Sequence, residues 1–327
     1  MAIDSILDRV GLIEQENIDP AHLFKLPMAL ISQDRRQEAE DILRQIHSLF
    51  LQHNGDISKG ASKSSNSAYH EFYNYIDGWI LRAAILVGMQ DEYRLSIDRY
   101  LSGQRENGGF ITHAIELDDG ITDIISTANG GMVCLALNDN RRAIKAGDYL
   151  VANLEKNKIK DGGLNKIFLR SNKDNQLITP VVENEGILSV DKNMEDQLYF
   201  MVAFPVAFLS YLYEVSRDER YLSTAIEYAE FLISCNPRFV ESDASHKTAW
   251  ALSCLFMHTN NENYKLPIIE IISHFEEIKD RDTGLWFIDD SLKSLDQSAE
   301  ISCWWSEIEK NIPHIFEKDE KSQFRMK

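Results

Sequence analysis

One unit recurs along this sequence: an almost wholly apolar stretch, a short polar turn, and a stretch that is apolar on one side only. Apolar positions in both stretches follow the helical period, so each unit predicts a hairpin of two helices. The four clearest copies span residues 78–110, 126–164, 204–235 and 246–286. A hairpin of this kind cannot bury its own apolar faces and must pack against its neighbours.

The hairpins predict the fold class. Helical patterns dominate the sequence, so we expect an all-α protein of ten to twelve helices, with further helices in 25–53 and 296–316. The more apolar helix of each hairpin is expected inside and the charged helix outside. We therefore expect an α/α toroid (barrel) of five to six helical hairpins that forms a single domain over residues 1–327.

Three segments fall outside the helical patterns. Residues 55–67 are rich in serine and glycine, so we expect a mobile loop there, which is either a lid or a plain linker. The spacing between corresponding positions of successive units widens across 165–194, which is therefore interpreted as a long inserted loop. Residues 317–327 are expected to form a mobile tail.

Charge and composition limit the partners and the location. The chain has 52 Asp+Glu and 34 Lys+Arg, a formal net charge of −18, which disfavours nucleic acid and anionic lipid as partners. The N-terminal stretch lacks the features of a signal peptide, and no apolar run is long enough to span a membrane. The four cysteines are far apart and form no CxxC pair, so reduced thiols and a cytoplasmic location are expected.

The turn that ends the first copy carries a recognisable motif. The segment Tyr100-Leu101-Ser102-Gly103-Gln104-Arg105-Glu106-Asn107-Gly108-Gly109-Phe110 resembles the aromatic-Leu-x-x-Gln-x-x-x-Gly-Gly-Phe repeat of terpenoid cyclases and protein prenyltransferases, which are α/α toroids. The hairpin over residues 204–232 is also similar to those of six-hairpin carbohydrate enzymes, such as sugar epimerases and unsaturated-uronyl hydrolases. The resemblance covers roughly 70–290 and implies the architecture more strongly than the chemistry.

The catalytic motifs of these families are missing. The Asp-x-Asp-Asp motif of triterpene cyclases has only Glu116-Leu117-Asp118-Asp119 as its nearest string, and the zinc ligands of protein prenyltransferases have no match. The Asp-Asp-x-x-Asp motif for diphosphate and magnesium is also absent. Neither family's catalytic residues can be carried over, and no metal or cofactor is expected.

Acidic, hydroxyl, imidazole and aromatic residues gather just before the apolar helices. If those helices line the toroid, its pocket opens where they begin, and these residues surround its mouth. Acids over an apolar cavity can have raised pKa values and serve as proton donors. The candidate catalytic residues are Asp196, Asp123, His246 and Tyr199. Simple helix capping is the alternative for Asp123 and Asp196, as it is for Ser126, Asp243 and Ser245.

Aromatic and basic residues supply the candidate binding groups. Aromatic faces can stabilise a cationic carbon or hold a polyene or sugar ring, although core packing also accounts for many of them. Arg82 lies within an apolar helix, where burial requires an acidic partner or a bound anion. The predicted substrate-binding residues are Tyr69, His70, Tyr73, Trp79, Arg82, Thr127, Phe200, Lys247, Trp250, Trp304 and Trp305.

Three functions remain open at this point. The first is a cofactor-independent cyclase or isomerase that acts on an apolar terpenoid or polyketide intermediate in natural-product biosynthesis. The second is a carbohydrate-active enzyme, for which Asp123 with Asp196, or Asp119 with Asp243, would be the facing carboxylates. The third is a non-catalytic helical-repeat protein that binds a peptide or protein.

Overall fold

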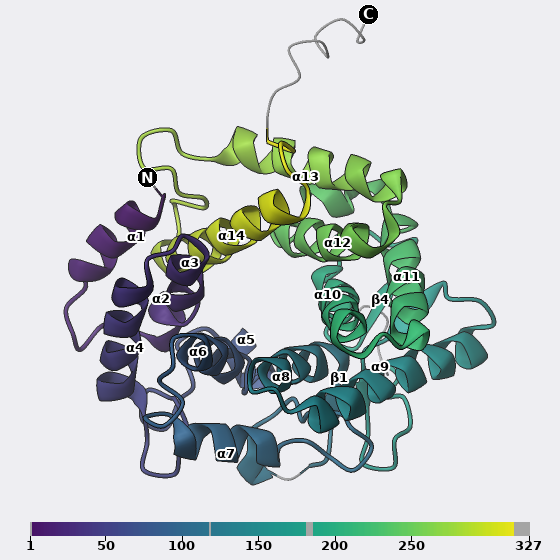
Figure 1. Cartoon of the computed structure of the whole chain (residues 1–327), viewed down its shortest axis with the longest axis horizontal. Helices are drawn as coiled ribbons and strands as arrows, with labels where there is room; N and C mark the ends of the chain where they lie inside the picture. The colour runs from purple at the N-terminus through teal and green to yellow at the C-terminus, as the bar shows by residue number, and fades with distance from the viewer. Residues whose placement is uncertain (1, 118, 181–185, 317–327) are drawn as a thin grey trace, which may run out of the picture.

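The predicted hairpins form a closed double ring of helices (Figure 1). The structure, a computed structural model, describes residues 2–117, 119–180 and 186–316. In these residues, the inner ring consists of α3 (Leu26–Ser32), α6 (Tyr75–Leu86), α8 (Ile124–Ala136), α10 (Phe200–Ser216), α12 (His246–Thr259) and α14 (Ser291–Asn311). The outer ring consists of α1 (Ala2–Gly11), α4 (Arg36–Phe50), α7 (Arg94–Ser102), α9 (Asn140–Asp161), α11 (Glu219–Ile233) and α13 (Lys265–Ile278).

Each inner helix packs against the next one along the chain, and the last, α14, packs against the first, α3. The outer helix α1 also packs against α14, so the two ends of the described chain meet at the closure of the ring (Figure 1). Short elements connect the hairpins: α2 (Pro20–Leu23), α5 (Ala68–Glu71), η1 (Ile115–Leu117), η2 (Pro237–Glu241) and η3 (Glu262–Tyr264). The expected all-α toroid is confirmed: in the described residues, five hairpins of consecutive helices and the closing pair of α14 with α1 make up the double ring.

The hairpin α10–α11 illustrates why the helices alternate between the two rings. Residues 201–210 of α10 are all buried, because this helix touches α8, α11 and α12. A helix that is apolar on nearly every side is stable only inside such a layer. In α11, by contrast, buried residues such as Tyr221, Ala225 and Leu232 follow the helical period and the remaining side faces solvent.

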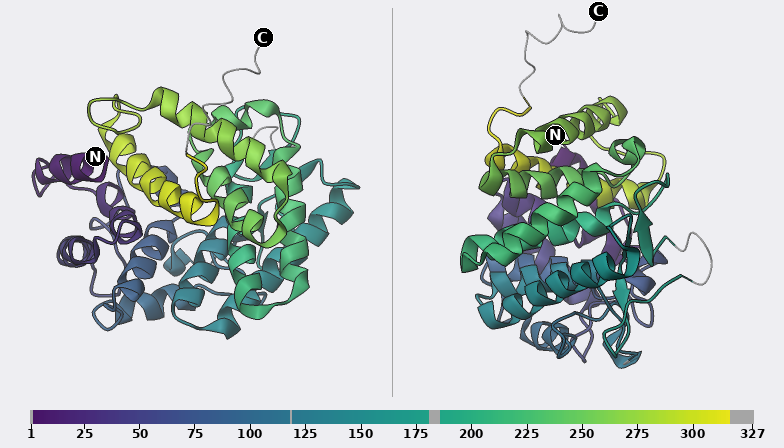
Figure 2. Two further views of the ribbon diagram at one scale, coloured as in Figure 1. Left: turned by 45° about the horizontal axis from the view of Figure 1, so that its top comes forward. Right: turned by 90° about the vertical axis from the view of Figure 1, so that its right-hand side faces the viewer.

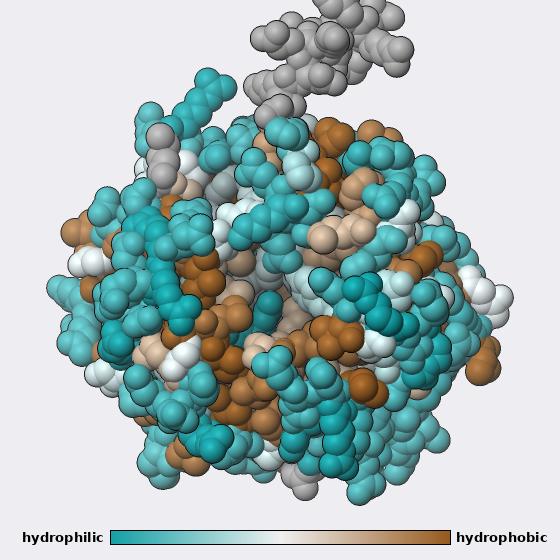
Figure 3. Space-filling view, viewed as in Figure 1, coloured by the Kyte–Doolittle hydropathy of each residue, from teal (hydrophilic) through white to brown (hydrophobic). Residues whose placement is uncertain are grey.

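Aromatic side chains fill the middle of the ring. The rings of Trp250 and Trp304 stack with 3.8 Å between centroids, and Trp79 lies 5.0 Å from Trp304. Phe204 adds an edge contact to Trp250 at 5.4 Å. These side chains come from four different inner helices, so they tie the ring together across its axis. The space-filling view shows a hollow at the centre of one end of the ring, bordered by apolar side chains (Figure 3).

The inserted segment 165–194 contains short strands. β2 (Lys166–Phe168) pairs antiparallel with β4 (Ser189–Asp191), and β3 (Arg170–Ser171) pairs antiparallel with β1 (Thr122–Asp123). The strands lie together at one end of the helical ring (Figure 2, right). That is the end at which the inner helices begin, since β1 directly precedes α8 and β4 comes shortly before α10.

The segment 55–67 is anchored to the body. Lys63 is fully buried, and its ammonium pairs with Asp56 at 2.9 Å and Asp77 at 2.6 Å. Ser64 donates a hydrogen bond to Asp19 at 2.6 Å. Mobility or lid motion in the rest of this segment stays a prediction, as does the single-domain boundary at 1–327. The expected tail 317–327 lies outside the described residues.

In the described part of the chain, no helix combines the length and apolarity that crossing a membrane requires.

A glycine allows α8 and α10 to approach each other closely. A Cβ atom on Gly131 would lie 2.2 Å from the ring of Phe208. We predict that Gly131→Ala lowers the free energy of unfolding by about 1–3 kcal/mol, because overpacking forces the two helices apart. Urea unfolding measures the change. Gly11→Ala is the control, since nothing lies within 4 Å of its added Cβ. Equal stability of the two variants would contradict the close approach.

Candidate active site

A cavity of about 480 Å³ lies at the end of the ring where the inner helices begin. Each of the six inner helices contributes to its lining at or beside its first turns. These contributions are Lys25 before α3, Tyr75 of α6, Ile125 of α8, Phe200 and Met201 of α10, Lys247 of α12, and Leu292, Lys293, Asp296 and Gln297 of α14. The sequence pattern predicts the pocket at this same end.

The wall of the cavity is mostly apolar. The side chains that form it are Ala68, Phe72, Ile125, Ile187, Leu198, Phe200, Met201, Ala244 and Leu292, together with the rings of Tyr69 and Tyr75. Charged side chains at its edge are partly neutralised, since Lys293 pairs with Asp243 at 2.5 Å. The cavity therefore suits a molecule that is apolar over most of its surface.

Beneath the apolar wall lies a group of buried charges that we call the lysine–carboxylate cluster: Lys25, Lys247, Asp296, Glu300 and His246. The Lys25 ammonium lies 2.5 Å from both Asp296 and Glu300. Lys247 lies 3.0 Å from Glu300, and His246 Nε2 lies 3.5 Å from the same carboxylate. All five side chains are at most 5% exposed, so each charge depends on its partners in place of water.

The cluster reaches the cavity through hydrogen bonds. The Tyr69 hydroxyl donates to Asp296 Oδ2 at 2.8 Å, and Gln297 Nε2 donates to the same oxygen at 3.0 Å. Lys247 donates to Gln297 Oε1 at 3.3 Å. Its ammonium also lies 5.0 Å from the centre of the Phe200 ring, a cation–π distance. Tyr69, Gln297, Lys247 and Phe200 all line the cavity, so a bound molecule would meet both the apolar wall and the polar cluster.

The two lysines of the cluster differ in proton affinity. Burial acts to lower the pKa of Lys25, but its ion pairs with Asp296 and Glu300 outweigh this and raise it. Burial also lowers the pKa of Lys247, and here the shift persists because Glu300 only partly compensates for burial and for the nearby Lys25 charge. Lys25 is thus a fixed cation, whereas Lys247 gives up a proton more readily than an ordinary lysine.

Glu300 and His246 both have lowered pKa values, which leaves one charged and the other neutral. Burial alone would raise the pKa of Glu300, but Lys247 and Lys25 hold it well below its usual range, so the carboxylate stays ionised. Burial and the adjacent Lys247 charge lower the pKa of His246 to about 3, so its imidazole is neutral at physiological pH. The cluster as a whole therefore carries paired charges, with Lys247 as the member that combines a lowered pKa with access to the cavity.

Several predicted site residues meet here. His246 belongs to the lysine–carboxylate cluster, and Lys247, Tyr69 and Phe200 line the cavity. Trp304 lies below the cluster, where its Nε1 donates to Glu300 at 3.2 Å. The predicted binding residues Trp79 and Trp250 pack against Trp304 in the middle of the ring and support the cluster from below.

Asp123 is the side-chain cap of α8. Its carboxylate accepts hydrogen bonds from the Ser126 amide at 2.6 Å and the Ser126 hydroxyl at 2.7 Å. The Thr127 hydroxyl donates to the Asp123 carbonyl at 2.6 Å and accepts from the Phe110 amide at 2.9 Å. Both residues are buried and neither is among the residues that line the cavity. Their contacts match the capping alternative.

Asp196 and Tyr199 lie outside the cavity lining as well. Asp196 is exposed, in a left-handed backbone conformation with φ of +52°. The Tyr199 hydroxyl donates to the Met194 carbonyl at 2.6 Å, and its ring packs against Phe239. The apolar pattern of α10 does not reveal the left-handed conformation of Asp196, and so it does not predict that the Asp196 side chain is exposed.

The remaining predicted binding residues also lie away from the cavity lining. His70 is exposed, and Tyr73 donates to Asp56 at 2.8 Å beside Lys63. Trp305 packs on Phe275. Arg82 is only 9% exposed, and its Nη1 has no hydrogen-bond partner within the described residues.

Lys25 and Glu300 were not predicted from the sequence. One local signal was available: Asp296, Glu300 and Trp304 are spaced four residues apart, which places both carboxylates and the indole on one face of a helix. Lys25 has no such signal, because its partners lie at the other end of the chain. Across residues 2–117, 119–180 and 186–316, no group of three or more His, Cys, Asp or Glu side chains could hold a metal ion.

Glu300 pairs with both lysines of the cluster, so its removal tests the cluster. We predict that Glu300→Gln lowers the free energy of unfolding by about 3–5 kcal/mol, because it leaves the buried Lys247 ammonium without a counter-charge and Lys25 with Asp296 alone. Urea unfolding measures the loss. Glu195→Gln serves as the control, since it removes a carboxylate from an exposed pair with Arg238 and should change stability little. A small effect of Glu300→Gln would show that the cluster is less well paired than its distances indicate.

His246 makes stability depend on pH. Its pKa is about 3 in the folded state and near the ordinary value of 6.5 when unfolded, so the unfolded chain binds the extra proton between these values. Stability should therefore fall as pH is lowered from about 6.5, and His246→Gln should flatten this slope between about pH 6.5 and 5, above the range in which carboxylates titrate. Unfolding curves at several pH values measure the slope, with the exposed His53→Gln as the control. An unchanged slope in His246→Gln would refute the buried neutral imidazole.

Comparison with known proteins identifies the architecture. No family model matches the chain, and no curated protein sequence is similar to it. Among solved structures, D-mannose isomerase aligns at 12% identity over 89% of this chain and 86% of that chain, with a TM-score of 0.62. A glycoside hydrolase of family 105 from C. acetobutylicum aligns at 11% identity over 94% and 99%, with a TM-score of 0.60. The type II terpene cyclase MstE from Scytonema, in complex with geranylgeranyl dihydroxybenzoate, aligns at 12% identity over 95% and 97%, with a TM-score of 0.57. At these identities the likeness establishes the fold alone, and it confirms that the chain is an α/α toroid, as the glycine-rich repeat indicated.

Proposed function

We propose that this protein is an enzyme that cyclises or isomerises a small, largely apolar organic molecule, such as a terpenoid or polyketide intermediate, without a cofactor. The observation that carries the proposal is an apolar cavity with one polar corner, in which Lys247 joins the lysine–carboxylate cluster to the cavity. Such a site can hold a flexible chain in a reactive conformation while a single polar group activates it.

Lys247 is the proposed catalytic residue. As an ammonium it can donate a hydrogen bond to a carbonyl oxygen of the substrate and stabilise negative charge that develops there. As an amine, which its lowered pKa favours, it can take a proton from a carbon beside that carbonyl and return it at another position. Both steps conserve the atoms of the substrate, so a cyclisation or isomerisation needs no second reactant.

The other cluster members position Lys247. Glu300 holds the Lys247 ammonium at 3.0 Å. The positive charge of Lys25 helps to lower the pKa of Lys247. Tyr69 and Gln297 both donate to Asp296. This leaves the Tyr69 oxygen as an acceptor and the second amide N–H of Gln297 as a donor at the polar corner. The walls from α8 and α10, including Ile125, Leu198 and Phe200, would exclude water and fold the apolar part of the substrate.

A carbohydrate-active enzyme is the second candidate. Its support is that Asp243 and Asp296 both line the cavity. The carboxylate pairs considered from the sequence fit less well, since Asp123 and Asp196 lie outside the lining and Asp119 lies 2.5 Å from His113. A glycosidase needs two carboxyl groups that act on the sugar, and here Asp243 and Asp296 are each already paired with a lysine at 2.5 Å.

Binding separates the two candidates before any substrate is identified. Trp250 and Trp304 lie beneath the cavity, so tryptophan fluorescence should respond to occupancy. We predict saturable binding of farnesol and none of mannose, with farnesol binding weakened about tenfold by Phe200→Ala, because that change removes an aromatic ring from the apolar wall. Met257→Ala, an exposed apolar substitution, is the control. Tight binding of mannose with no response to farnesol would favour the carbohydrate candidate.

Turnover of an identified substrate tests Lys247 directly. We predict that Lys247→Met lowers kcat by about 10²–10⁴-fold, because it removes the proposed donor and base while keeping the side-chain length. Circular dichroism should show an unchanged helical fold. Asp196→Asn is the matched comparison, since the sequence pattern favours Asp196 as the catalytic acid whereas the cavity geometry favours Lys247. Loss of activity in Asp196→Asn with an active Lys247→Met would overturn the assignment.

A further inference from the structure

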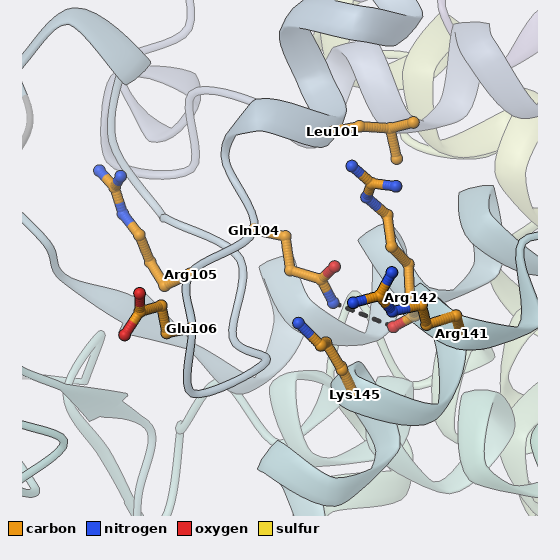
Figure 4. Close-up of a pocket in the computed structure, with 7 residues that line it drawn as sticks. All are labelled: Leu101, Gln104, Arg105, Glu106, Arg141, Arg142 and Lys145. Atoms are coloured by element: carbon orange, nitrogen blue, oxygen red, sulfur yellow. Dashed lines mark hydrogen bonds between the residues drawn. The ribbon is translucent and has the colours of Figure 1, made fainter.

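A second pocket, of about 230 Å³, lies on the outer wall between α7 and α9. It is lined by Leu101, Gln104, Arg105, Glu106, Arg141, Arg142 and Lys145. Four of these seven side chains are basic, in a chain whose formal net charge is −18. In Figure 4, Arg141, Arg142 and Lys145 lie on the same side of the turn as Gln104, whereas Arg105 and Glu106 lie on its other side.

The glycine-rich repeat builds this pocket. Gln104 Nε2 donates to the Gly108 carbonyl at 3.1 Å and to the Arg142 carbonyl at 2.9 Å, which fastens the turn to α9. Gly108 has a φ of +91°, and a Cβ there would lie 2.0 Å from the Lys145 carbonyl oxygen. Turn and helix therefore touch through their backbones. The backbone of the pocket is therefore in place before any ligand binds, and the basic side chains extend from the N-terminal end of α9.

Two of the basic side chains lie at the N-terminal end of α9, where positive charge does not stabilise a helix. Arg141 and Arg142 lie in the first turn of α9, which has no acidic residue, although the positive end of the helix dipole favours acids there. Arg142 is compensated by Asp139, which caps the helix and pairs with the guanidinium at 3.0 Å. Within the described residues, neither Arg141 nor Lys145 forms an ion pair. Both side chains are exposed, so their charges are accessible to an anion from solvent.

We propose that this pocket binds a phosphate group, either as the free ion or as part of a small phosphate ester. Two guanidinium groups and one ammonium group match a dianion with three terminal oxygens better than they match a carboxylate. Arginine donates in a fork that fits adjacent phosphate oxygens, and the lysine adds a point charge. The proposal concerns a site on the outer wall and does not rest on the function proposed for the central cavity.

Calorimetric titration of the whole chain at low ionic strength tests the site. The ligands are inorganic phosphate, glycerol 3-phosphate and acetate. We expect saturable binding of one or both phosphates, with acetate at least about tenfold weaker, and loss of affinity as salt is added. The tighter of the two phosphates distinguishes a free-ion site from an ester site.

The double variant Arg141→Gln/Lys145→Gln should weaken phosphate binding about tenfold or more for each of the two charges removed, because hydrogen bonds to charged groups are the strong ones. Arg36→Gln/Arg44→Gln on α4 makes the same change in net charge at exposed positions outside this pocket and should bind as the parent does. Absence of saturable binding, equal weakening in both double variants, or acetate as tight as phosphate would each overturn the proposal.

Discussion

The architecture depends on the fact that the inner helices are buried on most sides, and that all of them except α14 are mainly apolar. Such a helix is stable only when it is covered all round, and a hairpin alone covers it on one side. An open row of hairpins would leave the two end helices uncovered. Packing of α14 against α3 removes both ends at once, and the aromatic contacts among Trp79, Trp250 and Trp304 fill the axis.

This arrangement explains why the polar site lies at one end. The tryptophan stack occupies the middle of the ring, so space remains where the inner helices begin and their first turns spread around a cavity. Charges at that depth cannot be solvated by water, and two lysines are balanced by two carboxylates. The balance is uneven, since Lys25 has two carboxylates at 2.5 Å and Lys247 has one at 3.0 Å. That asymmetry is consistent with the pKa of Lys247 being lowered while the pKa of Lys25 is raised.

Much of the fold could be predicted from the sequence, because an all-apolar helix followed by an amphipathic one is a local pattern. The hairpin expected at 204–213 and 220–235 is observed as Phe200–Ser216 and Glu219–Ile233. The site was less predictable. The rule that polar residues before the inner helices surround a pocket selected Lys247 and Tyr69, which line the cavity. It also selected Asp123, which caps α8, and Asp196, which is exposed. In the sequence, a carboxylate that caps an apolar helix looks the same as one that lines a cavity, and only three-dimensional contacts distinguish the two. Lys25 was missed because its partners are remote in the chain.

The bond between Lys25 and Glu300 joins residues 275 positions apart. A contact of such long sequence separation forms late, since closing so large a loop costs entropy that only the completed structure offsets. The lysine–carboxylate cluster therefore cannot form in any partly assembled intermediate that lacks α14. During synthesis, Lys25 emerges early and gains its buried counter-ions only when α14 packs against α3.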